Sequence, residues 1–258
     1  MYPAAQLRHQ AKTFFTGKLE PLVGTHEDEV TCATCRQRER CLAGCVSDED
    51  LGRVENVVYT RRRTKRGAPL LVAGDRFEYL YAIRSGSFKT CLVEHEGREQ
   101  VTGFFMGGDI LGMEGLGHGR YQTNAVGLED GDVCAMPYSL IELLGRELPS
   151  LQRGLEAALA REIQRSQSVM MILGSMGARE RLAAFLVNLS RRYLRGGLSS
   201  SELHLRMTRE EIGSYLGLKL ETVSRLFSGF QRDGLMEVHL KHVRILDMPG
   251  LQRALGQG

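Results

Sequence analysis

Residues 207–236 read MTREEIGSYLGLKLETVSRLFSGFQRDGLM. Thr208 is followed three residues later by Glu211, a capping box that predicts the start of a helix. Gly217 predicts a turn after this helix, because glycine adopts the positive φ that tight turns require. A second helix is expected from Leu220 onward. Two short amphipathic helices joined by a glycine turn predict a helix-turn-helix, a motif that places its second helix in the major groove of DNA.

The second of these helices carries Glu221, Ser224 and Arg225 at spacings of three and four residues, which puts them on one face. Arginine can hold guanine O6 and N7, glutamate can accept from cytosine N4, and serine can contact a base edge or a phosphate. We therefore expect base contacts from these three residues. The alternative is a solvated face with a Glu221–Arg225 ion pair, worth about 0.2–0.5 kcal/mol. Contacts to the DNA backbone are expected from Thr208, Arg209, Lys219 and Arg232.

Outward from this motif the sequence predicts an α+β protein. Between residues 51 and 136, short apolar runs separated by glycine turns are typical of a β-roll or jelly roll. After Pro149 apolar residues recur at three- and four-residue steps, which predicts a long helix. The expected parts are an N-terminal cysteine segment (1–50), a β-roll sensor domain (51–148), a dimerisation helix (149–176) and a winged helix-turn-helix domain (177–258). Residues 235–246 are the candidate wing, although no glycine stands at the expected tip around Leu240 and Lys241.

The apolar stripe of the long helix has two interpretations. Such a stripe usually packs on its own domain, but the length of this helix favours a partner helix in a second copy of the chain. We therefore expect a homodimer. The residues assigned to the seam are Leu155, Leu159, Ile163, Met170 and Leu173, to which Ser166 is added below.

Three of the six cysteines, Cys32, Cys35 and Cys41, lie close together, and Cys134 lies about a hundred residues further on. The sequence contains no apolar run long enough for a membrane span and no apolar signal segment at its N-terminus, so we expect a cytoplasmic protein without a membrane partner. In that reducing compartment clustered cysteines favour metal ligation or redox chemistry over structural disulfides. Four thiolates suit an iron-sulfur cluster, and a structural zinc site or a redox disulfide stays open at this point.

Neither the net charge nor a catalytic motif identifies the function of this chain. The formal net charge of +3 is too small to identify a nucleic-acid partner. Cys32 and Cys35 form a C-x-x-C motif, but the βαβ setting of thioredoxin-like enzymes is missing and no set of acid, base and nucleophile is present. We expect a binding protein and not an enzyme.

Five stretches of the chain resemble the FNR group (fumarate and nitrate reduction regulators) of the cyclic-AMP receptor protein superfamily. They are CATCRQRERC, LYAIRSGSFKT, EQVTGFFMGGDILG, ERLAAFLVNLSRR and the helix-turn-helix quoted above. The resemblance implies a transcription regulator whose [4Fe-4S] cluster is held by Cys32, Cys35, Cys41 and Cys134 and is destroyed by oxygen. It also implies that the E-x-x-S-R pattern of Glu221, Ser224 and Arg225 recognises palindromic double-stranded promoter DNA with TTGAT-like half-sites. RNA polymerase is the implied protein partner, contacted near the loop at residues 94–98.

Three positions stand apart from that pattern. The resemblance places Ser166 where oxygen sensors carry an acidic residue on the dimerisation helix, which removes like-charge repulsion from the seam. Lys219 replaces the usual threonine N-cap of the second helix, so its first turn is expected to be weaker by about 1 kcal/mol. Cys45 is a possible substitute ligand. Rival interpretations are a regulator of the same fold that senses nitric oxide through haem or a small effector, or one that responds to zinc or thiol oxidation.

Overall fold

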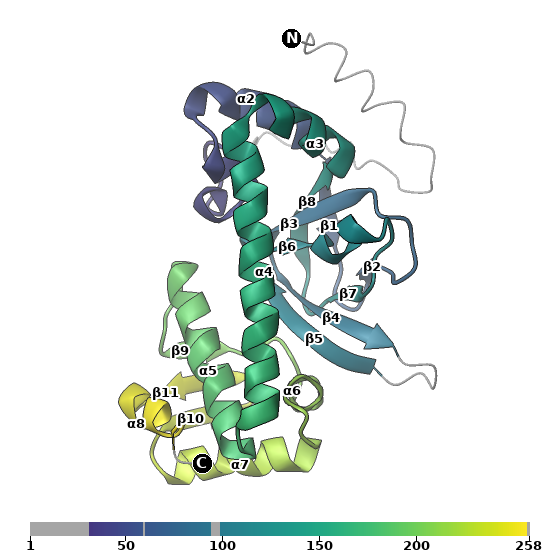
Figure 1. Cartoon of the computed structure of the whole chain (residues 1–258). Helices are drawn as coiled ribbons and strands as arrows, with labels where there is room; N and C mark the ends of the chain where they lie inside the picture. Colours follow the sequence, from purple (N-terminus) through teal and green to yellow (C-terminus); the bar gives the residue numbers. More distant parts are fainter. Residues whose placement is uncertain (1–30, 59, 94–98, 257–258) are drawn as a thin grey trace. The chain divides into compact units, whose positions relative to one another are not determined.

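The computed structural model describes residues 31–58, 60–93 and 99–256 (Figure 1). The chain forms two compact units: unit 1 contains Met1–Thr90 and Phe104–Ala160, and unit 2 contains Cys91–Gly103 and Arg161–Gly258. The expected α+β class is confirmed, with a β-sheet domain, a long helix and a C-terminal helix-turn-helix. Among the helices of the described residues, none is long and apolar enough to cross a bilayer.

Eight strands form the β-roll as two four-stranded sheets, ordered β1-β8-β3-β6 and β2-β7-β4-β5. Short strands separated by glycine turns produce this roll, as their spacing predicted. The bounds are β1 (Thr60–Thr64), β2 (Pro69–Leu71), β3 (Tyr79–Ser85), β4 (Ser87–Val93), β5 (Glu99–Met106), β6 (Ile110–Leu111), β7 (Asn124–Gly127) and β8 (Gly131–Pro137), with a 3-10 turn η3 (Met113–Gly117).

Strand β3 is buried on both faces, which explains why its sequence is apolar without alternation. One face carries Tyr81 and Ile83 into a core shared with Phe88 and Phe105. The opposite face carries Leu80 and Ala82 into a second core, to which the cysteine segment and three helices contribute. Because this second core joins distant parts of the sequence, it places the segment against the sheet.

The cysteine segment contains two 3-10 turns, η1 (Arg38–Arg40) and η2 (Leu42–Cys45). A helix, α2 (Asp48–Val58), follows where the sequence suggested the β-region to begin. The Ser47 Oγ accepts from the backbone N–H of Asp50 at 3.3 Å, and acidic residues in the first turn suit the positive end of the helix dipole. Leu51 and Val54 of this helix are buried. A second unexpected helix, α3 (Tyr138–Glu147), follows β8.

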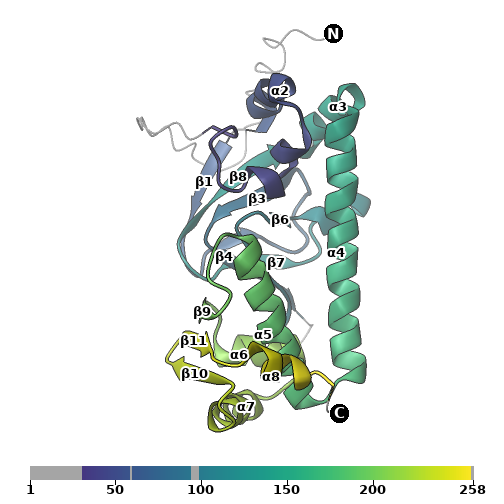
Figure 2. The same ribbon diagram turned by 90° about the vertical axis from the view of Figure 1, so that its left-hand side faces the viewer.

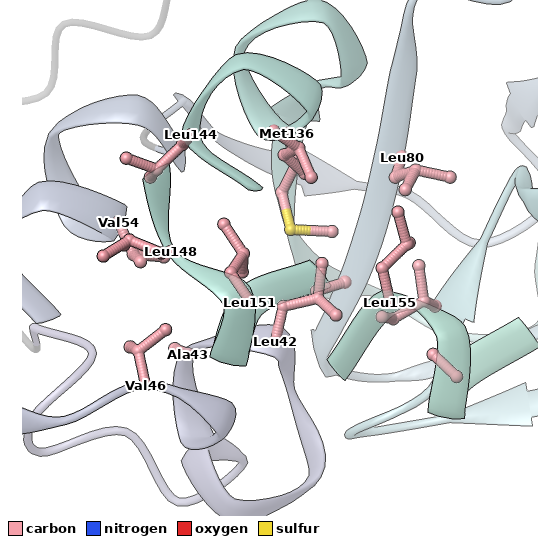
Figure 3. Close-up of a cluster of buried hydrophobic side chains, with 14 of the residues drawn as sticks. Leu42, Ala43, Val46, Val54, Leu80, Met136, Leu144, Leu148, Leu151 and Leu155 are labelled. Carbon is pink, nitrogen blue, oxygen red and sulfur yellow. The ribbon is translucent and has the colours of Figure 1, made fainter. Parts of the chain in front are cut away.

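Helix α4 (Pro149–Ser175) contains the boundary between the two units. Its first half belongs to unit 1, where Leu151, Leu155 and Ala158 are buried. Figure 3 shows Leu151 and Leu155 in the same core as Leu42, Ala43 and Val46 of the cysteine segment. The start of α4 is thus part of the structure that surrounds the cysteines.

Unit 2 contains α5 (Ala178–Arg195), α6 (Arg209–Leu216), α7 (Leu220–Arg232) and α8 (Met248–Arg253). A three-stranded sheet of order β10-β11-β9 lies beside them (Figure 2), formed by β9 (Glu202–His204), β10 (Met236–His239) and β11 (His242–Ile245). The expected wing is therefore present. Its tip uses Leu240 at a φ of 55°, a left-handed conformation that a non-glycine residue adopts only at a cost.

Candidate metal centre and nucleic-acid interface

Tight turns hold the three clustered cysteines in place. The backbone N–H of Cys35 donates to the carbonyl of Cys32 at 3.3 Å, and that of Gly44 donates to the carbonyl of Cys41 at 3.0 Å. A Cβ atom at Gly44 would lie 2.3 Å from the carbonyl oxygen of Arg38, so glycine is required there. The segment is therefore compact although it contains little regular structure.

Side chains from elsewhere in unit 1 anchor this segment. Glu55 Oε1 of α2 accepts the backbone N–H of Cys32 at 2.5 Å. The side chains of Gln37 and Arg40 in the cysteine segment pack against the turn between β5 and β6. A Cβ at Gly107 would lie 2.7 Å from Gln37 Nε2, and one at Gly108 would lie 2.8 Å from Arg40. These anchors were not predicted; the adjacent glycines Gly107 and Gly108 are the sequence signal that accompanies them.

Cys134 reaches the same place from β8. It pairs with Ala82 of β3 and with Arg61 of β1, and alternation along the strand puts it on the face of Met136. That face belongs to the core that buries Cys32 and against which Cys41 and Cys134 pack. The fold thus brings the distant cysteine to the N-terminal three.

The pKa values of these thiols are shifted by burial and by the other thiols. Burial is the main cause that raises the pKa of Cys41 to about 12; the charges of Cys32, Cys134 and Cys35 contribute in the same direction, and a backbone hydrogen bond at Ala43 opposes them. Burial also raises the pKa of Cys134 to about 11, with added contributions from Cys32 and Cys35, while Arg84 and Arg61 lower it. Cys32, Cys41 and Cys134 thus share one core, with Cys35 joined to Cys32 by a backbone hydrogen bond, and burial there makes an unbound thiolate unfavourable.

The donor set fits an iron-sulfur cluster. Within the described ranges, no three His, Cys, Asp or Glu side chains are placed to hold a single metal ion. A cubane does not require four sulfurs to converge on one atom, because each thiolate binds a different iron. Arg61 and Arg84 supply positive charge beside Cys134, which suits an anionic ligand set.

The two remaining cysteines occupy other surroundings. Cys91 in β4 has an exposed fraction of 0% and belongs to the buried apolar side chains. Cys45 lies against α4: a Cβ at Gly154 would be 2.6 Å from its Sγ. The Cys45 side chain therefore contacts the long helix.

The second half of α4 exposes an apolar stripe in unit 2. Ile163, Met170 and Met171 have exposed fractions of 58%, 64% and 58%. Ser166 is exposed on the same helix, and Leu173 is partly buried. Of the other residues assigned to a seam, Leu155 is buried in unit 1 and Leu159 packs against the same core. Met171 is an addition that the sequence pattern did not single out.

The helix-turn-helix has the geometry that its sequence predicted. Thr208 Oγ1 accepts from the backbone N–H of Glu211 at 3.1 Å, and Glu211 Oε2 accepts from the N–H of Thr208 at 2.7 Å. Gly217 ends α6 in the left-handed conformation at a φ of 63°. Helix α7 begins after Lys219, whose side chain makes no capping hydrogen bond, as expected.

The exposed face of α7 presents Glu221, Ser224 and Arg225 together. Arg225 Nε donates to the backbone carbonyl of Glu221 at 3.4 Å. No ion pair joins the two side chains in the described part of the chain, so the glutamate carboxylate and the rest of the guanidinium face solvent. The opposite face buries Val223, Phe227 and Phe230.

The four residues assigned to phosphates differ in exposure. Lys219, Arg232 and Thr208 are exposed. The guanidinium carbon of Arg209 lies 3.3 Å from the centre of the Phe227 ring, and burial lowers the pKa of Arg209 to about 10. Arg209 is thus partly desolvated against the recognition helix.

Comparisons with known proteins agree with this architecture. Residues 180–254 match the Crp-like helix-turn-helix domain and residues 61–145 match the cyclic nucleotide-binding domain. The chain is 41% identical over 230 residues to the transcriptional regulatory protein btr of Bordetella pertussis, covering 89% of this chain and 95% of that protein. It is 35% identical over 227 residues to the fumarate and nitrate reduction regulatory protein of Escherichia coli K12, covering 88% and 91%.

A solved structure gives the same result. FixK2 from Bradyrhizobium japonicum matches with a TM-score of 0.70 at 27% identity, covering 76% of this chain and 96% of that chain. The sequence relatives are transcription regulators and not enzymes.

Proposed function

Because the chain belongs to the CRP/FNR family of DNA-binding transcription regulators, we propose that it senses oxygen through a [4Fe-4S] cluster and controls anaerobic-metabolism promoters. The observation that carries this proposal is that Cys134 of β8 packs against the same core as Cys32 and Cys41, with Cys35 bonded through its backbone to Cys32. The fumarate and nitrate reduction regulators among the relatives support it.

The four thiolates would hold the cluster, which reacts with oxygen when bound. The chain contributes a partly buried site that limits solvent and two arginines, Arg61 and Arg84, that offset negative charge beside Cys134. It also contributes a ligand from β8, so that the N-terminal segment is tied to the sheet through Cys134. Loss of the cluster would remove this link between the N-terminal segment and the sheet.

The cysteine segment and the start of α4 pack in one hydrophobic core. Leu42, Ala43 and Val46 of the segment lie in the same core as Leu151 and Leu155 of α4 (Figure 3). A core packed at native density does not deform smoothly, so a shift of the segment displaces the helix surface that it touches. This is how the state of the thiols would reach the dimerisation helix.

The exposed stripe of Ile163, Met170 and Met171 supports a homodimer. Burying such a stripe against its copy removes apolar surface from water, and methionine adapts to imperfect packing. Ser166 adds no charge to this seam. Pairing would therefore depend less on the cluster than in a regulator with an acidic residue at that position.

A two-fold dimer would present two copies of α7 to a palindromic site. Glu221, Ser224 and Arg225 would read TTGAT-like half-sites, and Thr208, Arg209, Lys219 and Arg232 would contact the backbone. RNA polymerase is the expected protein partner on the promoter. The loop proposed for that contact, residues 94–98, lies outside the described residues. A regulator of this kind acts in the cytoplasm, where promoters are accessible.

The test is to purify the protein without oxygen and measure iron, acid-labile sulfide and DNA binding before and after exposure to air. The proposal expects four irons and four sulfides per chain, and DNA binding that falls when air is admitted. Zinc in place of iron, a haem spectrum, or unchanged DNA binding in air would each contradict it and favour one of the rival sensors.

A further inference from the structure

One side chain in the first turn of α5 joins two other helices of unit 2. Arg181 Nε donates to the carbonyl oxygen of Met176 at 2.8 Å, and Arg181 Nη2 donates to that of Leu173 at 2.8 Å. Its Nη1 donates at 3.0 Å to the carbonyl of Leu216, the last residue of α6. Each nitrogen of this guanidinium thus binds a different carbonyl. We call these three contacts the α4–α6 joint, because they link the end of α4 to the end of α6.

The carbonyls of this joint lie at helix C-termini. Leu173 is in the last turn of α4, and Met176 directly follows Ser175, at which this helix ends. The last carbonyls of a helix lack partners within it and carry partial negative charge, so a guanidinium that faces two such ends is stabilised by both. Arginine holds its donors in a rigid fork, whereas lysine offers one nitrogen on a flexible stem. The joint therefore depends on the shape of this side chain as well as on its charge.

The turn of the helix-turn-helix lies beside the same joint. A Cβ atom at Gly217 would be 3.3 Å from Arg181 Nη1 and 3.5 Å from Leu173 Cδ2. Gly217 connects α6 to α7 and has a φ of 63°, so it approaches the joint in a conformation that favours glycine. Because α7 follows this turn directly, the joint sets where α7 lies relative to the end of α4.

The neighbours of Arg181 in the sequence make different contacts. Glu180 Oε2 accepts the backbone N–H of Gly177 at 2.6 Å, which fixes the start of α5 directly after α4. Arg179 Nη2 lies 2.6 Å from Oδ2 of Asp233, the residue that follows α7. Arg179 thus contacts the far end of α7, whereas Arg181 contacts α4 and α6. The two arginines share one helical turn and one charge but differ in the helices that they join.

We propose that Arg181 is a positioning residue that fixes the helix-turn-helix on the end of α4 and thereby selects the separation of the half-sites that a dimer binds. This inference rests on the proposed function, in which α4 pairs two copies and α7 reads DNA. One added base pair moves a half-site by about 3.4 Å along the DNA and turns it by about 34–36°. A firm joint makes the dimer discriminate against such a shift, and a loosened joint lets both copies of α7 follow it.

The experiment compares the anaerobically purified full chain with its Arg181→Gln, Arg181→Lys and Arg179→Gln variants. Binding is measured to palindromic operators whose TTGAT-like half-sites are moved apart or together by single base pairs. In Arg181→Gln the preference for the best separation should fall roughly tenfold or more, because one hydrogen bond from a charged donor is worth about that factor. Arg181→Lys should fall between this variant and the unchanged chain. Arg179→Gln removes the same charge from the same turn and should keep the full preference.

The salt dependence of binding distinguishes positioning from direct DNA contact. All three guanidinium nitrogens of Arg181 bind protein carbonyls, so Arg181→Gln should leave the salt slope unchanged. A salt slope reduced by about 1, with the preference for one separation intact, would make Arg181 a phosphate contact and overturn the proposal. Equal loss of that preference in Arg179→Gln would overturn it as well.

Hydrogen exchange tests the joint without DNA. Arg181→Gln should speed amide exchange in residues 172–177 and 213–218 and leave residues 229–234 unchanged, and Arg179→Gln should do the reverse. Unchanged exchange at both ends of the joint would overturn the assignment. An unchanged chain that binds none of the operators would contradict the proposed function, and exchange would still decide whether the joint exists. Melting curves identify a variant that does not fold, and Arg181→Lys then supplies the comparison.

Discussion

The cysteine segment, residues 31–47, and the helix-turn-helix, residues 207–236, are held together in different ways. The helix-turn-helix is stabilised by neighbours in sequence: Thr208 and Glu211 cap each other, and Gly217 forms the turn. The cysteine segment relies on distant residues, with Glu55 binding the Cys32 backbone and Cys134 arriving from β8. The comparison teaches that local signals define the helices of the helix-turn-helix, whereas the cysteine segment adds to its own tight turns long-range contacts that a bound group would strengthen.

The largest effect is expected in the core beneath the cysteines. Leu42 is 2% exposed, so Leu42→Ala should destabilise unit 1 by about 2–5 kcal/mol. It should also impair retention of iron, because the segment that carries the thiols loses its packing. Chemical denaturation and iron content measure the two effects. The control is Val223→Ala, which removes buried volume from the helix-turn-helix. Equal iron loss in this control would show that the two regions are not independent.

A smaller change is expected at the DNA surface. Arg225→Ala should cost about 1–3 kcal/mol at one base position and relax specificity there. Binding to operators with each base pair of the half-site varied measures this. Lys219→Ala is the comparison: because Lys219 is the proposed phosphate contact, its loss should weaken binding to all sequences alike and reduce the salt slope by about 1. A uniform loss in Arg225→Ala would remove it from base recognition.

The first turn of α7 offers a test in which stability and binding separate. Lys219 is an N-cap without a side-chain hydrogen bond, so Lys219→Thr should stabilise the helix by about 1 kcal/mol. The same change removes a positive charge and should weaken DNA binding. Thermal melting and affinity should therefore move in opposite directions. Tighter binding would show that Lys219 does not contact phosphate.

The wing tip provides the smallest change. Leu240 is 84% exposed and adopts a left-handed φ of 55°, which asparagine tolerates better than leucine. Leu240→Asn should raise the stability of unit 2 by about 1 kcal/mol. Urea denaturation, monitored by far-ultraviolet circular dichroism, measures this change in stability. A loss of stability would contradict the expected relief of strain at this position.

The same contrast explains what could be predicted from the sequence. The capping box, Gly217 and the spacing of Glu221 and Arg225 are local signals, so the helix-turn-helix and its exposed trio were predicted correctly in structure. The four cysteines were also selected, but only the fold reveals that β8 carries Cys134 to the others. Helix α2 was missed because its acidic first turn precedes only a short apolar pattern, Leu51 and Val54, within a region of strands. Gly107 and Gly108 resembled an ordinary turn because the side chains they accommodate, Gln37 and Arg40, are far away in sequence.

The stripe on α4 shows a further limit. Periodicity alone assigned Leu155 and Ile163 to one seam, yet Leu155 is buried in unit 1 and Ile163 is exposed. A helix pattern records which residues are apolar and not which neighbour covers them.

The most direct test of the central claim compares single cysteine replacements in anaerobically purified protein. Cys134→Ser removes a thiol that the fold places beside Cys32 and Cys35, and Cys45→Ser removes one that lies against Gly154. We predict that Cys134→Ser loses the Mössbauer signature of a [4Fe-4S] cluster and the air sensitivity of DNA binding, while Cys45→Ser keeps both. A cluster that persists in Cys134→Ser, or disappears in Cys45→Ser, would contradict the account.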